Sequence, residues 1–160
     1  MGKLKKLIQD RSADAFIFII ILVFFILTLA AILIEYFRME SLHQQVEYSL
    51  QRGINSAVEY AMRDEYRMDS YARMDTEASK EAFYKYLHEN MALDGELNKY
   101  TGGQWAYQLE IESINATEIP PRLELEGVLK TRSIFGFLTG DVRLRFYLAS
   151  KNTRIEEGGT

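Results

Sequence analysis

Residues 15–34 form an uninterrupted apolar run, AFIFIIILVFFILTLAAILI, which contains no charged residue, no proline and no glycine. Twenty residues in an α-helix, at about 1.5 Å each, extend about 30 Å, which matches the hydrocarbon core of a bilayer. A helix that is apolar on every face needs apolar surroundings on every face. The run therefore predicts a transmembrane helix, and this prediction constrains the rest of the chain.

Two other interpretations of the run are weaker. A buried core helix is unfavourable at this length and apolarity, because the chain has only 160 residues with which to surround it. A cleaved secretory signal has a shorter apolar region, about 7–15 residues, followed by small residues at the cleavage point. Thr28, Leu29 and Ala30 make a poor cleavage point, and residues 32–34 extend the run beyond it. We expect an uncleaved anchor.

The charges on the two sides of the run predict its orientation. Residues 1–14 hold four basic and two acidic side chains, whereas residues 35–50 hold one basic residue and three glutamates. The positive-inside rule therefore predicts a cytoplasmic basic tail, 1–14, and an extracytoplasmic C-terminal part. The residues that set this orientation are Lys3, Lys5, Lys6 and Arg11.

The charge of the remaining chain excludes one class of partner. Residues 35–160 hold 15 basic and 21 acidic side chains, a net charge of −6. Nucleic acid is bound by basic surfaces that displace its counterions, so we expect no nucleic-acid partner. The chain also has no cysteine, which excludes disulfides, thiolate catalysis and cysteine metal sites.

The helical pattern continues beyond the apolar run, over residues 35–63. Apolar side chains recur there every three or four residues, as on one face of an α-helix, and only Gly53 interrupts the pattern. We therefore expect one helix of about 50 residues, about 75 Å long, whose second half lies outside the membrane. The stripe on this half consists of Met39, Leu42, Val46, Leu50, Ile54, Ala57 and Ala61.

The membrane-proximal part of this stripe is a candidate subunit contact. A domain that begins after residue 64 has to fold back by about 27 Å to reach residue 46, at the helical rise of about 1.5 Å. Strands of about eight residues reach about 26 Å at best, so we expect the sheet to cover Ile54 but to reach the start of the stripe only marginally. The residues expected to need a partner chain are Met39, Leu42 and Val46.

Residues 64–149 are expected to form a small extracytoplasmic α+β domain. The polar segment 64–75 predicts a loop, and Asp75 or Thr76 can cap a second helix over 76–92. Gly95 is the stop signal for that helix, and the polar tail 150–160 is expected to be disordered.

Three strands are predicted after residue 104, where the apolar period changes from 3.6 to 2. They begin near Trp105, Leu123 and Val142, with turn signals at Pro120-Pro121 and at Gly136 and Gly140. Opposite charges predict a register for the last two strands in which Lys130 faces Asp141 and Glu126 faces Arg145. The expected fold is α+β: a long transmembrane helix that continues outside the membrane and packs on a three-stranded antiparallel sheet.

A family resemblance accompanies this pattern. Arg11–Phe16 (RSADAF) precedes the apolar helix, Ile34–Arg38 (IEYFR) follows it, and an amphipathic segment ends at Ala57–Ala61 (AVEYA). This arrangement resembles the N-terminal region of TadE-like proteins, the minor pilins or pseudopilins of tight-adherence (type IVc) pili, over roughly residues 10–63.

The resemblance implies a pilin-like subunit whose N-terminal helix packs among equivalent helices. Such prepilins usually have a glycine just before their cleavage point and a glutamate five residues later. Here the acidic residue nearest the start of the run is Asp14, and no glycine lies just upstream of it. No cleavage site is therefore transferred to this chain.

The sequence offers no catalytic set. His43 and His88 share no metal-ligand spacing with other candidate ligands, and we predict that both are surface residues. Four glutamates lie in two pairs with a spacing of two: Glu110, Glu112, Glu124 and Glu126. This spacing predicts the solvated face of a sheet and pairing with arginines rather than acid-base chemistry. There is no phosphate-binding glycine loop and no calcium-binding loop. We expect no enzyme activity, no cofactor, no metal and no small-molecule substrate.

These observations predict a bacterial cell-membrane protein with a structural function. We expect a single-pass, pilin-like subunit of a surface filament or secretion machine, in contact with membrane lipid and with further copies or other pilin-like subunits. The alternative is an anchored scaffold or accessory binding component that stays in the bilayer within a larger envelope complex. A filament subunit leaves the membrane, whereas a scaffold does not.

Overall fold

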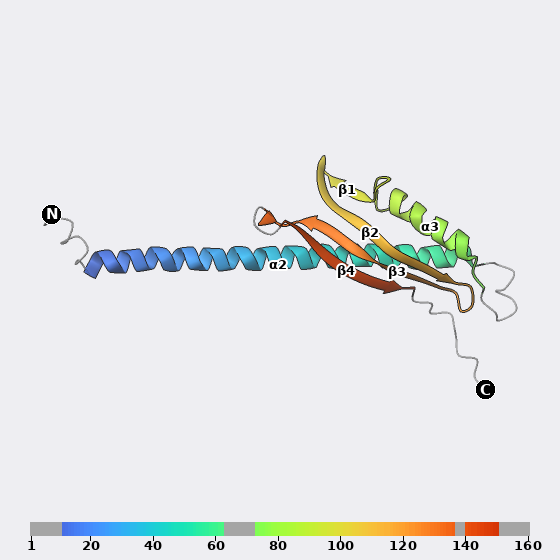
Figure 1. Ribbon diagram of the computed structural model, residues 1–160, viewed down its shortest axis with the longest axis horizontal. Coiled ribbons are helices and arrows are strands. Elements are labelled where there is room, and N and C mark those ends of the chain that lie inside the picture. Colours follow the sequence, from blue (N-terminus) through green and yellow to red (C-terminus); the bar gives the residue numbers. More distant parts are fainter. Residues whose placement is uncertain (1–10, 63–72, 137–139, 151–160) are drawn as a thin grey trace, which may run out of the picture. The chain divides into compact units, whose positions relative to one another are not determined.

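The computed structural model describes residues 11–62, 73–136 and 140–150 (Figure 1). The chain divides into two compact units, residues 1–41 and residues 42–160, and α2 contributes to both. The helices and strands, in chain order, are α2 (Arg11–Ala61), α3 (Thr76–Glu89), β1 (Asn98–Thr101), β2 (Gln104–Thr117), β3 (Arg122–Arg132) and β4 (Asp141–Ala149).

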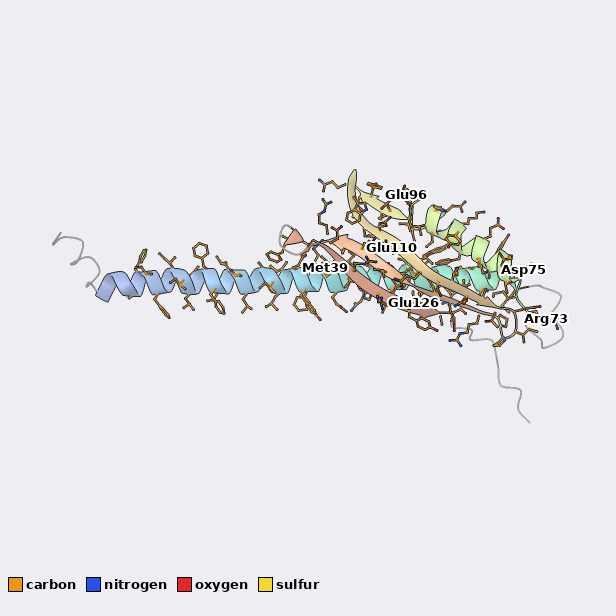
Figure 2. The ribbon with its side chains drawn as sticks, viewed as in Figure 1. Met39, Arg73, Asp75, Glu96, Glu110 and Glu126 are labelled. Carbon is orange, nitrogen blue, oxygen red and sulfur yellow. The ribbon has the colours of Figure 1, made fainter. Side chains whose placement is uncertain are left out.

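Most of the described part of the first unit is the apolar run of α2, residues 15–34. None of the side chains of residues 15–34 is buried, and large apolar side chains are exposed on every face of the helix (Figure 2). The hydroxyl of Thr28 donates to the backbone carbonyl of Phe24 at 2.8 Å. Because the helix itself satisfies this side-chain donor, residues 15–34 present an unbroken apolar surface.

The second unit is built on an antiparallel sheet in the order β1-β2-β3-β4. The prediction of three strands is wrong, because β1 precedes the three that the alternation predicted. β1 has only four residues and no apolar alternation, and it is joined to β2 by Gly102 and Gly103, which have φ of 59° and 77°. Two glycines with positive φ form the tight hairpin turn that suits the twist of paired strands. The described fold is α+β, with a long apolar N-terminal helix and a four-stranded antiparallel sheet.

One hydrophobic core joins α2, α3 and one face of the sheet. The stripe on α2 supplies Leu50 and Ile54, which are fully buried, and α3 supplies Phe83 and Leu87. The sheet contributes alternate residues of each long strand, as a strand with one buried face requires. The sheet residues in this core include Tyr107, Leu109, Leu123, Leu125, Leu129 and Phe146.

α3 begins where the sequence predicts. The carboxylate of Asp75 accepts hydrogen bonds from the backbone N–H groups of Glu77 and Ala78, both at 3.1 Å, and so caps the first turn. The helix ends at Glu89 rather than at residue 92, so Gly95 is not its stop signal. Asn90 caps it instead, with its backbone N–H bonded to the carbonyl of Tyr86 at 2.9 Å.

Gly53 lies where α3 crosses α2. A β-carbon at this position would lie 2.6 Å from the Tyr86 ring and 3.3 Å from the Phe83 ring. Atoms at 2.6 Å overlap, so only glycine lets the two aromatic rings approach α2 this closely. The glycine that interrupts the predicted stripe is therefore a point of close contact between the two helices.

The predicted register of the last two strands is wrong by two residues. Lys130 pairs with Arg143 rather than with Asp141, and Glu126 pairs with Tyr147 rather than with Arg145. A shift of two keeps every side chain on its predicted face, because the period of a strand is two. The alternation therefore predicted the buried face correctly, but it could not determine which residues of the two strands pair with each other.

Gly127 gives the physical reason for the observed register. It pairs with Phe146, and a β-carbon on it would lie 2.8 Å from the Phe146 ring and 2.3 Å from the Glu110 carbonyl oxygen. The aromatic ring therefore fills the space that the missing side chain leaves. In the register predicted from charge, Phe146 would face Leu125. Two large side chains would then have to fit into the same space on the buried face of the sheet.

Candidate functional site

By length and composition, the described residues contain one helix that could cross a membrane, and its most apolar stretch is not buried. Large side chains remain exposed along the whole run, for example Phe18 at 65% and Phe24 at 67%. A contiguous apolar surface of this length marks a site of interaction with lipid or protein rather than with water. Residues 15–34 are therefore the strongest candidate for a functional surface.

Aromatic and charged side chains follow the run directly. Tyr36 and Phe37 are exposed, and their ring centroids lie 5.6 Å apart in an edge arrangement. Glu35 accepts two hydrogen bonds from the guanidinium of Arg38, at 2.8 and 3.1 Å, and this hydrogen bonding raises the pKa of Arg38. Aromatic rings next to the first charges are typical of the boundary between lipid and water.

The residues predicted to set the orientation fall mostly outside the described structure. Lys3, Lys5 and Lys6 lie outside the described residues, whereas Arg11 and Asp14 lie in the first turns of α2. The inside-outside orientation therefore stays a prediction from the sequence.

The stripe predicted to contact a partner divides between the two units. Val46 is 3% exposed and belongs to the core of the second unit, so it needs no partner chain to cover it, whereas Leu42 is only partly buried against that core. The estimate of how far the sheet reaches was too short. It assumed about eight residues a strand, whereas β2 has 14 and extends about 46 Å at 3.3 Å a residue. Met39 belongs to the other unit, and its role in a subunit contact stays a prediction.

The described residues contain no group of three or more histidine or acidic side chains that could hold a metal ion. The two histidines instead bond to backbone carbonyls: Nδ1 of His88 lies 3.1 Å from the Leu93 carbonyl oxygen, and Nε2 of His43 lies 3.2 Å from that of Arg145. Because a carbonyl only accepts, each ring nitrogen is the donor. Both histidines thus hold neighbouring segments of the second unit together.

His43 belongs to a contact that the sequence analysis missed. It bonds to an edge carbonyl of β4, and Nε2 of Gln51 donates at 3.0 Å to a second one, that of Ala149. Eight residues of helix extend about 12 Å, and the four residues from Arg145 to Ala149 extend about 13 Å, so the spacings match. α2 therefore runs along the edge of β4 and occupies carbonyls that another strand could otherwise pair with.

The outer face of the sheet carries a cluster of three charged residues. Glu110 accepts hydrogen bonds from Nζ of Lys130 and, at 2.8 Å, from the guanidinium of Arg143. The hydrogen bond from Lys130, followed by the attraction of both cations, lowers the pKa of Glu110. This carboxylate offsets the repulsion between Lys130 and Arg143, which face each other across β3 and β4. The cluster is a cross-strand ion network rather than an acid-base pair.

Comparison of this chain with protein-family models, with curated proteins and with solved structures finds no match. The surfaces described above are therefore the basis for inferring a function.

Proposed function

We propose that this chain is a single-pass membrane protein whose residues 15–34 span the bilayer. The proposal rests on one observation: a continuous α-helix in which these residues are apolar and exposed on every face. Leaving one large apolar side chain in water forfeits about 1.5–3 kcal/mol, and this segment has more than a dozen of them. The basic residues before the run favour a cytoplasmic N-terminus and an extracytoplasmic second unit.

We further propose that the protein is a pilin-like, TadE-like structural subunit of a cell-surface pilus or related secretion machine, without enzyme activity. Two features support this. The N-terminal pattern around the apolar run resembles that family, and the second unit packs the end of a long helix on an antiparallel sheet, the general layout of pilin-like subunits. In this function the apolar helix is stored in lipid and later exchanges lipid contacts for contacts with equivalent helices.

The test is the fate of the protein in cells of its native host. Mechanical shearing of intact cells should release it into a high-molecular-weight fraction that lacks an integral membrane enzyme used as marker. Retention of all of the protein with the marker would contradict the filament function.

Cross-linking sharpens this test because the natural chain has no cysteine. A single Ala31→Cys substitution in the apolar run should give disulfide-linked dimers in the sheared fraction, since small side chains allow close helix contact. Tyr60→Cys is the matched control on the same helix, because that exposed position lies in the second unit. Dimers at position 60 but not at position 31 would contradict packing through the apolar helix.

A membrane-anchored scaffold or accessory component is the second candidate. It is favoured by the burial of Val46 and Leu50 in the chain's own core, which leaves that face of α2 with no apolar stripe to offer to a neighbour. A scaffold would stay with the membrane marker after shearing and co-purify with a larger complex from detergent extracts.

A further inference from the structure

A cavity of about 420 Å³ lies within the second unit, between α2, the end of α3 and the hairpin of β1 and β2. Its wall is apolar where Leu42, Val46 and Ala106 line it, and polar where Arg52, Lys99 and Tyr107 do. Most of the lining residues are polar, and a cavity of this size can hold a small organic ligand.

Two cations line the cavity without a carboxylate partner. Neither Arg52 nor Lys99 forms an ion pair in the described part of the chain, and no aspartate or glutamate is among the residues that line the cavity. Residues 35–160 carry a net charge of −6, so a cavity with two positive charges and no negative charge stands apart from its surroundings. Such a cavity attracts an anion.

Lys99 is held in place by its own strand. A register shift between Lys99 and Tyr100 interrupts the pairing of β1 with β2, and such a bulge turns a side chain toward a new direction. Its Nζ donates to the carbonyl of Met91 at 2.6 Å. An ammonium group has three N–H donors, so two remain for a ligand. The ammonium is therefore positioned before any ligand binds.

Tyr107 contributes a hydroxyl that bonds to no other residue in the described part of the chain. Its side chain is only 8% exposed, yet the described structure contains no buried side-chain nitrogen or oxygen that lacks a hydrogen-bond partner. Since Tyr107 lines the cavity and its hydroxyl bonds to no other described residue, we infer that this hydroxyl is accessible from the cavity. Burial raises the pKa of Tyr107, so the hydroxyl stays protonated at neutral pH and can donate a hydrogen bond to an anion.

We propose that this cavity binds the phosphate group of a small organic phosphate ester. The guanidinium of Arg52, the ammonium of Lys99 and the hydroxyl of Tyr107 supply charged and neutral donors, which suit the several oxygens of a phosphate better than the two of a carboxylate. The apolar wall on α2 accommodates the carbon skeleton of the ester. Thr101 and Asn90, at the same cavity, offer further polar groups. The proposal does not depend on whether the protein forms a filament.

Such a phosphate ester could be the headgroup of an anionic lipid or a soluble molecule, and the test separates them. The full chain, purified in a neutral detergent, is treated with an acetylating reagent, and mass spectrometry measures the acetylation rate of each lysine. Soluble glycerol 3-phosphate is the probe in the first arm. In the second arm the protein is reconstituted in bilayers of phosphatidylcholine, with or without phosphatidylglycerol.

Binding should slow the acetylation of Lys99 at least threefold in one of the two arms and leave Lys85 unchanged. Lys85 is a suitable internal control because it is exposed on α3, outside the cavity. Protection by glycerol 3-phosphate identifies a soluble ligand, and protection only in bilayers with phosphatidylglycerol identifies a lipid headgroup. Protection in neither arm would overturn the proposal.

Two variants test the roles of the named groups. In Arg52→Gln, protection of Lys99 should need at least a tenfold higher ligand concentration than in the unchanged protein. Arg122→Gln removes an equal charge from β3 outside the cavity and should not change this concentration. Tyr107→Phe keeps the ring and removes only the hydroxyl, and it should weaken protection severalfold without lowering the stability of the domain. Equal protection in Arg52→Gln and the unchanged protein would also overturn the proposal.

Discussion

α2 contains two apolar regions, one with exposed side chains and one with mostly buried side chains. In residues 15–34 every position except Thr28 is apolar, and no side chain is buried. In residues 42–61 apolar side chains occupy one stripe, and most of that stripe is buried against the sheet and α3. The helix is continuous from one region to the other.

The difference shows that the distribution of apolar residues, rather than their number, determines which environment a helix needs. A stripe about 100° wide can be covered by one sheet face, which the chain supplies itself. An apolar surface on all sides cannot be covered by a domain of this size, so it needs lipid or several other helices. The first region therefore implies an environment outside the chain, and the second region does not.

The largest expected effect is an all-or-none difference in accessibility between the two sides of residues 15–34. In intact, wall-stripped cells, a membrane-impermeant maleimide should label Tyr60→Cys, which replaces a residue that is 78% exposed. It should label Leu4→Cys only after permeabilisation. This follows if residues 15–34 span the bilayer with the N-terminus inside.

The control for this labelling is the natural chain, which has no cysteine and should give no signal. Labelling of Leu4→Cys but not Tyr60→Cys in intact cells would reverse the orientation. Equal labelling of both variants in intact cells would mean that residues 15–34 do not separate two compartments, and the comparison between the two regions would lose its basis.

A second prediction compares one substitution in the two regions. Ile54→Ala should destabilise the second unit by about 2–5 kcal/mol, because Ile54 is fully buried and truncation leaves a cavity. Ile19→Ala, on the same helix but 55% exposed, should leave that stability unchanged. Urea denaturation in a mild neutral detergent can be followed by the fluorescence of Trp105, the single tryptophan, which lies in β2. Equal losses in the two variants would show that the apolar run stabilises the second unit.

Periodicity predicted the helices and the buried faces because it depends on local spacing alone. The alternation from Trp105 onward gave the three long strands, and the capping signal at Asp75 gave the start of α3. The stripe on α2 was also correct, residue by residue, from Leu50 to Ala61. These features need no knowledge of which segment lies beside which.

Features that depend on contacts between distant segments were not predictable in the same way. The register of β3 and β4 depends on Phe146 covering Gly127, a contact across two strands that charge matching did not anticipate. β1 escaped notice because four residues show no alternation, although the pair Gly102-Gly103 was a hairpin signal. The cavity beside Arg52 and Lys99 forms only when β1 is in place, so sequence patterns alone did not predict it either.

The third prediction reverses a rule of helix propensity. In an isolated helix, glycine is about 1 kcal/mol less favourable than alanine. Gly53→Ala should nevertheless destabilise the second unit by about 1–3 kcal/mol, because the new methyl group would overlap the Tyr86 ring. In a Tyr86→Ala background the same substitution should become neutral or stabilising. A stabilising effect in both backgrounds would show that α3 does not approach α2 as closely as the structure has it.

The smallest expected effect concerns pH, and residues 15–34 cannot contribute to it because they carry no titratable group. The hydrogen bond from Lys130 lowers the pKa of Glu110 in the folded protein, while an unfolded chain restores the ordinary value of about 4.3. The charged network therefore contributes stability above about pH 4.3, and this contribution is lost as the pH falls through the lower pKa of the folded protein. Asp94 also has a lowered pKa, through hydrogen bonds from the backbone and side chain of Asn98, and it adds a loss of the same sign. The difference between the natural chain and Glu110→Gln isolates the network. Thermal melting followed by Trp105 fluorescence should show the natural chain more stable at pH 7, with the gap closing as the pH falls below about 4.3. A gap independent of pH would mean that Glu110 acts through packing rather than charge.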